Sequence, residues 1–202
     1  MKNKTRSLLA LALILITTLG CGFINQVKKE VEKSQAPKDV FATDNSCKIT
    51  VPGNWQTRAD LQEDAILQVA NTFSEQYAVV ISESKTDFSE DSSLLDYAEL
   101  LQGATRQRVN GITFSEIRNI QINGAPAVQY EAEGMVDKIK IKWIFNLIDS
   151  GKTYHQLVLW TLPSKYEQNK PIFDNVINSF KDLRDSDATV SSKNSNISIK
   201  TK

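Results

Sequence analysis

The chain has a single histidine, His155, and this number limits the chemistry that its side chains can perform. Catalysis by a serine or cysteine nucleophile generally needs a neighbouring base, and histidine is the usual one. His155 lies in a segment that alternates with apolar residues, where a polar side chain packed at a sheet edge or under a helix is the common case. We therefore expect a packing role for His155, with a catalytic or metal-binding role as the less favoured alternative.

Side chains that hold metals or phosphates are also sparse. Zinc sites need several cysteine and histidine ligands, and the sequence has two cysteines and one histidine. Asp87, Glu90 and Asp91 lack the spacing of a calcium loop and favour a solvated connection before a helix. The eight glycines form no phosphate-binding loop. We expect no metal and no other cofactor.

The N-terminal segment has the features of a secretory signal. Three bases among the first six residues precede an uncharged run, Leu8 to Leu19. This run is shorter than the roughly 20 residues of a transmembrane helix. It ends in Thr17-Thr18-Leu19-Gly20-Cys21, which resembles the lipobox of bacterial lipoproteins. The resemblance implies cleavage before Cys21 and a diacylglyceryl thioether on its sulfur; an ordinary secreted protein cleaved nearby is the alternative.

Acylation of Cys21 predicts where the protein resides. Two or more acyl chains anchor a protein durably, so the predicted partner is a membrane, contacted from outside the cytoplasm through the lipid on Cys21. The next residue is Gly22. In a Gram-negative cell the lack of aspartate there resembles lipoproteins on the periplasmic face of the outer membrane. In a Gram-positive cell the protein would lie on the cell surface.

The second cysteine, Cys47, would then have no disulfide partner. Cys47, Ile49 and Val51 alternate along a short strand and share its apolar face. We expect a buried, unreactive thiol.

The charge balance excludes one large class of partner. Lysine and arginine total 24, and aspartate and glutamate also total 24. Because a nucleic-acid-binding domain generally carries a basic excess, we expect no nucleic acid partner.

Composition divides the chain into four parts. A charged stretch after Cys21 has too little apolar surface to fold alone, and a polar stretch without aromatic residues closes the chain. The predicted parts are a lipoprotein signal peptide at 1–20, a lipidated N-terminus and tether at 21–40, a globular domain at 41–183 and a disordered tail at 184–202.

Within the globular part the hydrophobic pattern changes from strands to a helix and back. The predicted elements are strands at 48–51, 65–70 and 77–84, a helix capped by Ser92 or Ser93, an antiparallel meander at 112–162 and a final helix at 171–183.

Turn positions predict the register of the meander. A turn at Ser150-Gly151 pairs Leu147 with Tyr154, Trp143 with Val158 and Ile141 with Trp160. A loop at 134–137 pairs Glu133 with Lys138, Glu131 with Lys140 and Gln129 with Lys142. His155 then faces Asn146, on the opposite side of the sheet from Tyr154 and Trp160.

Two surfaces of this meander are candidate binding sites. Trp143, Tyr154 and Trp160 share one face and would line a pocket for an apolar ligand, although aromatic stripes on strands are usually core. The row Lys138, Lys140 and Lys142 would meet an anionic ligand or a lipid headgroup, although the opposing acids favour a neutralised surface.

The order of these elements resembles that of a known superfamily. Its markers are Val51-Pro52 followed by Trp55, the helix after Ser93, the turn Asn123-Gly124-Ala125-Pro126-Ala127, the segment 154–163, and the closing helix with Phe173, Ile177, Ser179 and Phe180. Over residues 45–183 this order resembles the PsbP-like superfamily, which includes extrinsic photosystem II proteins and many bacterial lipoproteins of unassigned activity. The resemblance implies an α+β fold: an α/β/α sandwich whose central antiparallel sheet is covered by helices. It carries no metal-binding or photosystem-docking residue over to this chain.

Three hypotheses for function follow. The leading one is a lipid-anchored, non-enzymatic accessory or binding protein of the cell envelope, with an unidentified envelope protein as partner. The second is a binding module for a small apolar or amphiphilic ligand on the aromatic sheet face. The third is an enzyme of unfamiliar type, which a cleft converging on His155 beside an acidic residue would favour.

Overall fold

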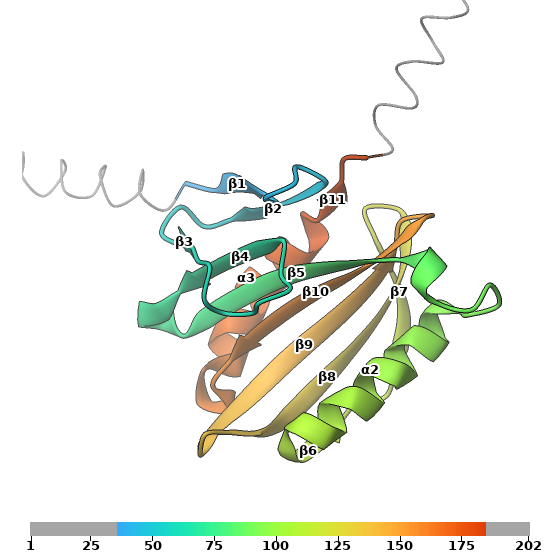
Figure 1. Ribbon diagram of the computed structural model, residues 1–202. Coiled ribbons are helices and arrows are strands. Elements are labelled where there is room, and N and C mark those ends of the chain that lie inside the picture. The colour runs from blue at the N-terminus through green and yellow to red at the C-terminus, as the bar shows by residue number, and fades with distance from the viewer. Residues whose placement is uncertain (1–35, 185–202) are drawn as a thin grey trace, which may run out of the picture. The chain divides into compact units, whose positions relative to one another are not determined.

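The computed structural model describes residues 36–184, which form a mixed α+β domain (Figure 1). The described helices and strands belong to one unit, made of Lys38–Val51 and the chain from Trp55 onward, whereas residues 36–37 and 52–54 belong to a second unit. The predicted signal peptide, Cys21 and the predicted tail beyond Arg184 lie outside the described residues. Within 36–184 no helix is long and apolar enough to cross a membrane.

A large antiparallel sheet forms the centre of the domain. In spatial order its strands are β3 (Gln56–Thr57), β4 (Leu67–Asn71), β5 (Gln76–Ser84), β10 (Thr153–Thr161), β9 (Ile139–Asp149), β8 (Ala125–Val136) and β6 (Asn110–Phe114), and β7 (Arg118–Ile122) pairs with the first half of β8. Strands β6 to β10 are the meander predicted at 112–162, and β3 to β5 extend the same sheet.

A second, three-stranded sheet has the order β1 (Lys38–Phe41), β2 (Cys47–Val51) and β11 (Lys181–Asp182). Only β2 was predicted from the sequence. Strand β1 includes Lys38 to Val40, which were assigned to the tether, because Asp39 pairs with Thr50 and accepts hydrogen bonds from Lys48 and Thr50. Within the described residues, regular structure therefore begins at residue 38 and not at residue 41.

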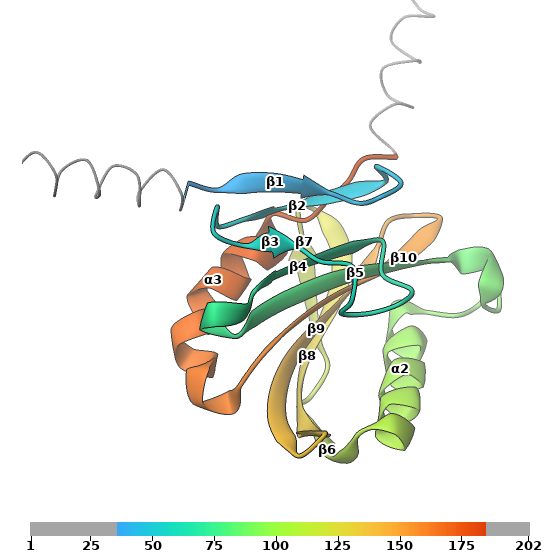
Figure 2. The same ribbon diagram turned by 60° about the vertical axis from the view of Figure 1, so that its left-hand side comes forward.

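Both faces of the large sheet are covered, as the predicted sandwich requires (Figures 1 and 2). Helix α2 (Leu94–Arg108) starts at Ser93, whose side chain forms a capping box with Asp96. Tyr97 and Ala98 of α2 pack on one face in a core cluster with residues of β8, β9 and β10. Helix α3 (Tyr166–Asn178) buries Phe173, Val176 and Ile177 in a second cluster on the other face, together with the three-stranded sheet.

The final helix lies earlier than predicted. It spans 166–178 instead of 171–183, and Pro171 lies inside it. Phe180 continues the apolar pattern, but the helix ends at Ser179, whose hydroxyl accepts from the backbone N–H of Thr50 at 2.8 Å. The chain then extends, and Lys181 and Asp182 pair with β2.

The predicted registers of the two long hairpins are wrong, although the faces are right. In the β9–β10 hairpin Trp160 pairs with Trp143 and Tyr154 with Asp149, because the turn residues are Gly151 and Lys152. His155 consequently pairs with Ile148, not Asn146. A shift of two residues preserves the alternation of a strand, so His155 still lies on the face opposite Tyr154 and Trp160.

In the β8–β9 hairpin the turn lies at Asp137 and Lys138, both with positive φ (49° and 69°), so β8 continues through Gly134. Glu133 pairs with Lys142 instead of Lys138. The predicted ladder of opposite charges exists but is diagonal. Its ion pairs join Lys140 to Glu133 and Lys142 to Glu131.

Position 134 of β8 requires a glycine, because a larger side chain would not fit there. A Cβ at this position would lie 2.7 Å from Val109 Cγ1 and 3.2 Å from the backbone Cα of Ile112. We expect Gly134→Ala to lower the free energy of unfolding by about 1–3 kcal/mol through overpacking, measured by urea unfolding.

Gly103→Ala is the matched control, because Gly103 lies within α2 and a Cβ there meets no atom within 4 Å. It is expected to raise the free energy of unfolding by up to about 1 kcal/mol through helix propensity. Equal effects of the two substitutions would contradict this account of Gly134.

Candidate functional site

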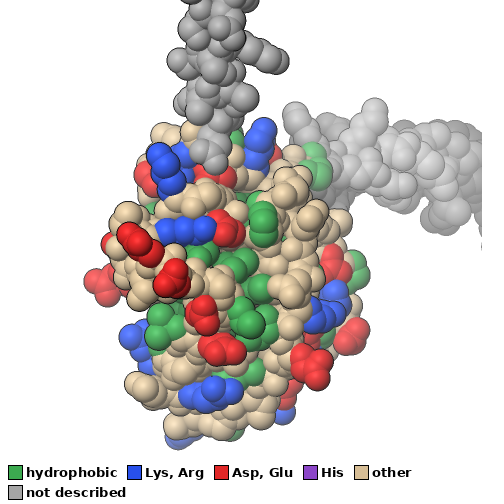
Figure 3. Space-filling view, turned by 90° about the vertical axis from the view of Figure 1, so that its right-hand side faces the viewer, with side chains coloured by type: hydrophobic (Ala, Val, Ile, Leu, Met, Phe, Trp, Pro, Cys, Tyr) green, Lys and Arg blue, Asp and Glu red, His purple; other side chains and the backbone are tan. Residues whose placement is uncertain are grey.

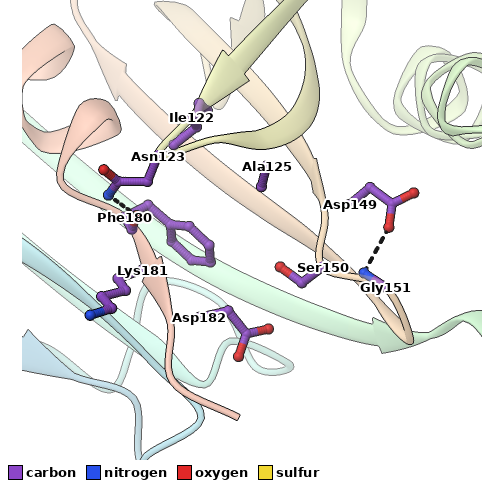
Figure 4. Close-up of a pocket in the computed structure, with 9 residues that line it drawn as sticks. All are labelled: Ile122, Asn123, Ala125, Asp149, Ser150, Gly151, Phe180, Lys181 and Asp182. Atoms are coloured by element: carbon purple, nitrogen blue, oxygen red, sulfur yellow. Dashed lines mark hydrogen bonds between the residues drawn. The ribbon is translucent and has the colours of Figure 1, made fainter. Parts of the chain in front are cut away.

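A pocket of about 460 Å³ lies where three turns of the chain meet at one end of the large sheet (Figure 4). The turns are those between β7 and β8, between β9 and β10, and between α3 and β11. The lining residues are Ile122, Asn123, Ala125, Asp149, Ser150, Gly151, Phe180, Lys181 and Asp182. Small-molecule sites are commonly of this volume. The pocket is therefore a candidate binding site that the sequence did not predict.

Hydrogen bonds across the turns keep the pocket in shape. Asn123 and Gly124 have φ values of 50° and 83°, as expected for an Asn-Gly turn between two strands. The Asn123 side chain donates a hydrogen bond of 2.6 Å to the carbonyl of Phe180, which ties this turn to the chain leaving α3 (Figure 4).

The two carboxylates of the pocket are already paired. Asp149 lies 2.6 Å from Lys85 Nζ and accepts a hydrogen bond from the backbone of Gly151. Burial raises the pKa of Asp182, but hydrogen bonds from Arg184 and His155 outweigh burial and hold that pKa well below its usual range. Across residues 36–184 no group of three metal-ligating side chains is found. The pocket walls thus offer polar groups, but both of their carboxylates are already paired.

His155 lies beyond the pocket wall on β10 and is 0% exposed. Its Nδ1 is 2.7 Å from Ser82 Oγ, and its Nε2 is 2.8 Å from Asp182 Oδ2. The Nε2–H tautomer satisfies both contacts, because Nε2 then donates to Asp182 and Nδ1 accepts from the Ser82 hydroxyl. In that tautomer Arg184 donates to Asp182, at 2.9 Å, and not to the ring.

The contacts from Ser82 through His155 to Asp182 connect the residue types of nucleophile, base and orienting acid in serine hydrolases, although the two ring nitrogens are exchanged relative to that arrangement. The acidic neighbour that would favour an enzyme is therefore present. The pocket, however, is lined by Asp182 and by neither His155 nor Ser82. The imidazole instead packs on Phe180, with ring centroids 5.0 Å apart. This arrangement joins β11 to the large sheet through a buried side chain.

Sequence reasoning missed most of this network. It placed Arg184 in a disordered tail, gave no role to Ser82 or Asp182, and predicted a turn at Asn123 without its contact to Phe180. The hydrogen-bond partners Ser82 and Asp182 are 73 and 27 residues from His155 along the chain, so no local motif signals the contact. The one available signal is that a buried histidine needs hydrogen-bond partners.

The predicted aromatic site divides into a packed and a partly exposed portion. Tyr154 is 3% exposed, stacks on Tyr97 and donates to the carbonyl of Ser92. Trp143 and Trp160 are adjacent on β9 and β10 and only partly buried, and Trp160 stacks on Tyr77 at 5.3 Å. We call Tyr77, Trp160 and Trp143 the aromatic row. Tyr154 belongs to the core, whereas the row retains some exposed surface.

Cys47 is buried, as predicted. Its side chain is 0% exposed, and burial raises the pKa of the thiol to about 12. A thiol with such a pKa is a poor nucleophile at neutral pH.

The surface facing the viewer in Figure 3 carries both signs of charge. Lysine and arginine side chains alternate there with aspartate and glutamate around a group of hydrophobic side chains. This face presents no field of one sign.

These elements define a PsbP-like α+β sandwich. Among solved structures, cyanobacterial PsbP (CyanoP) from Synechocystis sp. PCC 6803 is similar, with a TM-score of 0.55 and 13% identity over 74% of this chain and 94% of that one. LpqN, involved in cell envelope biogenesis of Mycobacterium tuberculosis, has a TM-score of 0.52 and 13% identity over 72% of this chain and 89% of that one. At such identities the likeness shows the fold. No protein-family model and no curated protein matches the sequence.

The buried histidine predicts how stability depends on pH. Burial lowers the pKa of His155, and the contact with Asp182 offsets this only in part. Protonation therefore favours the unfolded chain, whose histidine has a pKa of about 6.5. The free energy of unfolding is expected to fall as the pH drops below about 6.5, by at most about 1.4 kcal/mol per pH unit. Urea unfolding between pH 7.5 and 5 measures this slope.

Because His155 is the only histidine, His155→Gln should abolish the slope in this pH range while lowering stability at pH 7.5. Lys152→Gln, at an exposed position in the β9–β10 turn, is the control and should retain the slope. A slope that persists in His155→Gln would show that another group titrates on unfolding.

Proposed function

We propose that this chain is a lipid-anchored, non-enzymatic accessory or binding protein of the cell envelope, held by acyl chains on Cys21. The anchor is supported by the sequence Thr17-Thr18-Leu19-Gly20-Cys21 after a basic and apolar leader. The non-enzymatic role is carried by one observation, the state of His155. The only histidine of the chain is fully buried, and its two nitrogens are hydrogen-bonded to Ser82 and Asp182.

The solved structures with this fold are compatible with such a role. LpqN is described as involved in cell envelope biogenesis, and CyanoP shares the PsbP-like fold. A role beside other envelope proteins accords with a compact domain on a tether, since a tether keeps a domain close to its membrane while leaving its surface accessible.

One mass-spectrometric experiment tests both parts of the proposal. The protein is extracted from the membranes of a bacterium that produces it and treated with a fluorophosphonate, which reacts with activated serines. We expect a chain that starts at Cys21 with added acyl mass, and no phosphonate on Ser82. Cys21→Ala should lack the acyl mass.

The two parts fail independently. An unacylated chain, or one that keeps residues 1–20, would refute the anchor. Phosphonate on Ser82 that disappears in His155→Gln would refute the non-enzymatic role, because it would show that His155 activates this serine.

The aromatic row supports a second candidate, a binding module for a small apolar or amphiphilic ligand. Its specific observation is that Trp143 and Trp160 keep exposed surface on the sheet face that α2 also covers. Exposed aromatic faces offer apolar contact at little cost in side-chain entropy.

Tryptophan fluorescence distinguishes this candidate from the leading proposal. The candidate requires a saturable change on titration with oleate below its micelle concentration, and at least tenfold weaker binding in Trp160→Ala. Leu100→Ala, an exposed residue of α2, should bind as the parent does. A parent chain without a saturable change contradicts the candidate.

A further inference from the structure

The end of the large sheet opposite the pocket exposes hydrophobic side chains from two hairpins. Phe73, in the connection between β4 and β5, is 93% exposed. At the β8–β9 turn, Met135 is 48%, Val136 38% and Ile139 54% exposed. These four are a majority of the seven exposed large hydrophobic residues between 36 and 184. We call them the apolar tips.

The strand register places the β4–β5 and β8–β9 hairpins at the same end of the large sheet. Tyr77 pairs with Trp160 and Trp160 with Trp143, so the aromatic row crosses three neighbouring strands. Phe73 precedes Tyr77 by four residues, and Ile139 precedes Trp143 by four residues. Both hairpins therefore project beyond the row from the same end of the sheet, separated at their bases by two strand spacings, about 10 Å.

The chain enters the domain at this same end. Lys38, the first residue of β1, pairs with Val51, the last residue of β2. Four residues later Trp55 donates a hydrogen bond of 2.9 Å to Gln76, the first residue of β5 and close to Phe73. In Figures 1 and 2 the start of β1 and the β4–β5 hairpin accordingly lie on the same side. A tether from an acylated Cys21 would thus join the domain on the side of the β4–β5 hairpin, which carries Phe73.

The chemistry of this end suits a lipid surface. Lys138 and Lys140 flank Ile139 at the turn, where Lys140 also pairs with Glu133, and Lys165 follows β10 between the two hairpins. Two acids, Asp137 and Glu75, lie at the same end. Lysines beside exposed apolar residues keep their ammonium groups at headgroup level while the apolar side chains enter the acyl region. The aromatic row behind the tips is of the residue types that occur at membrane interfaces.

We propose that the apolar tips insert into the bilayer that holds the lipid anchor, and so fix the orientation of the domain. The inference rests on the proposed function, which supplies the anchor. Residues 22–37 span at most roughly 55 Å when extended, which leaves many orientations open. Anchoring makes the contact intramolecular, so four exposed side chains suffice to select one orientation.

Thiol-reactive probes test the insertion. Single substitutions Phe73→Cys and Ile139→Cys, and Lys152→Cys in the β9–β10 turn at the opposite end, are labelled with an environment-sensitive fluorophore. Cys47 is 0% exposed and so should not react in the parent chain. The acylated full chain is reconstituted in vesicles of phosphatidylcholine and phosphatidylglycerol (3:1). We expect blue-shifted emission, quenched by lipids spin-labelled near the headgroup, at positions 73 and 139 and not at 152.

A second arm removes the apolar side chains. The reporter is Ser164→Cys, an exposed position after β10 and between the hairpins. The pair Phe73→Asp and Ile139→Asp should abolish its blue shift, whereas Leu95→Asp with Leu100→Asp, exposed on α2, should leave it unchanged.

Equal emission at positions 73, 139 and 152, or a blue shift that survives the tip substitutions, would overturn the insertion. The intact mass of the same samples reports the acyl chains separately. Acylated protein without insertion refutes only this inference, and an unacylated chain refutes the anchor.

Discussion

Strand β10 is buried on both faces, and the rest of the domain follows from this constraint. Leu157 and Leu159 lie in the core beneath α3, and Tyr154 and Val158 lie in the core beneath α2. A polar side chain on such a strand has no access to water and must be paired within the protein. Three layers therefore have to assemble around β10. The polar residues of β10 need hydrogen-bond partners, and these partners lie on the covering elements.

Three polar residues of β10 each bind a different covering element. His155 reaches Asp182 of β11, Gln156 reaches Tyr97 of α2, and Thr161 accepts a hydrogen bond from Asn169 of α3. Burying these groups without partners would cost about 1–3 kcal/mol each, so the contacts discriminate against other placements of the helices and of the chain end. The buried position of the one histidine is thereby linked to the assembly of β11 on the large sheet.

The sequence predicts the sandwich because the period of its apolar residues is a local property. The helix after Ser93 and the Asn123-Gly124 turn were found from capping and turn residues alone. The β8–β9 register failed because Asp137 and Lys138 adopt positive φ without a glycine, while Gly134 lies in the strand in contact with Val109. The β9–β10 register failed because the turn residues are Gly151 and Lys152 and not Ser150 and Gly151. Strand β1 forms a hairpin with the adjacent β2, whereas β11 pairs with β2 from the far end of the domain, a distance in the chain that a local pattern does not encode.

The residues of the candidate site are also far apart along the chain. Trp143 and Trp160 were placed on one face because alternation survives a register shift of two residues. The pocket and the His155 network join residues between Ser82 and Arg184, and no spacing in the sequence predicts either of these sites. Exposure of an apolar residue is likewise a tertiary property: Phe73 and Phe173 are both phenylalanine, yet one is 93% and the other 0% exposed.

The two ends of the large sheet differ in physical character. At one end, turns and β11 are tied by hydrogen bonds around a polar pocket, and at the other end two hairpins expose apolar side chains. Strand β9 runs between them over 11 residues, a length of about 36 Å. With the apolar end against a bilayer, the pocket would lie well above the headgroups and face the aqueous side. A lipid-anchored domain oriented in this way would present its polar end to soluble ligands or to other envelope proteins, while its apolar end would be shielded from water by the membrane.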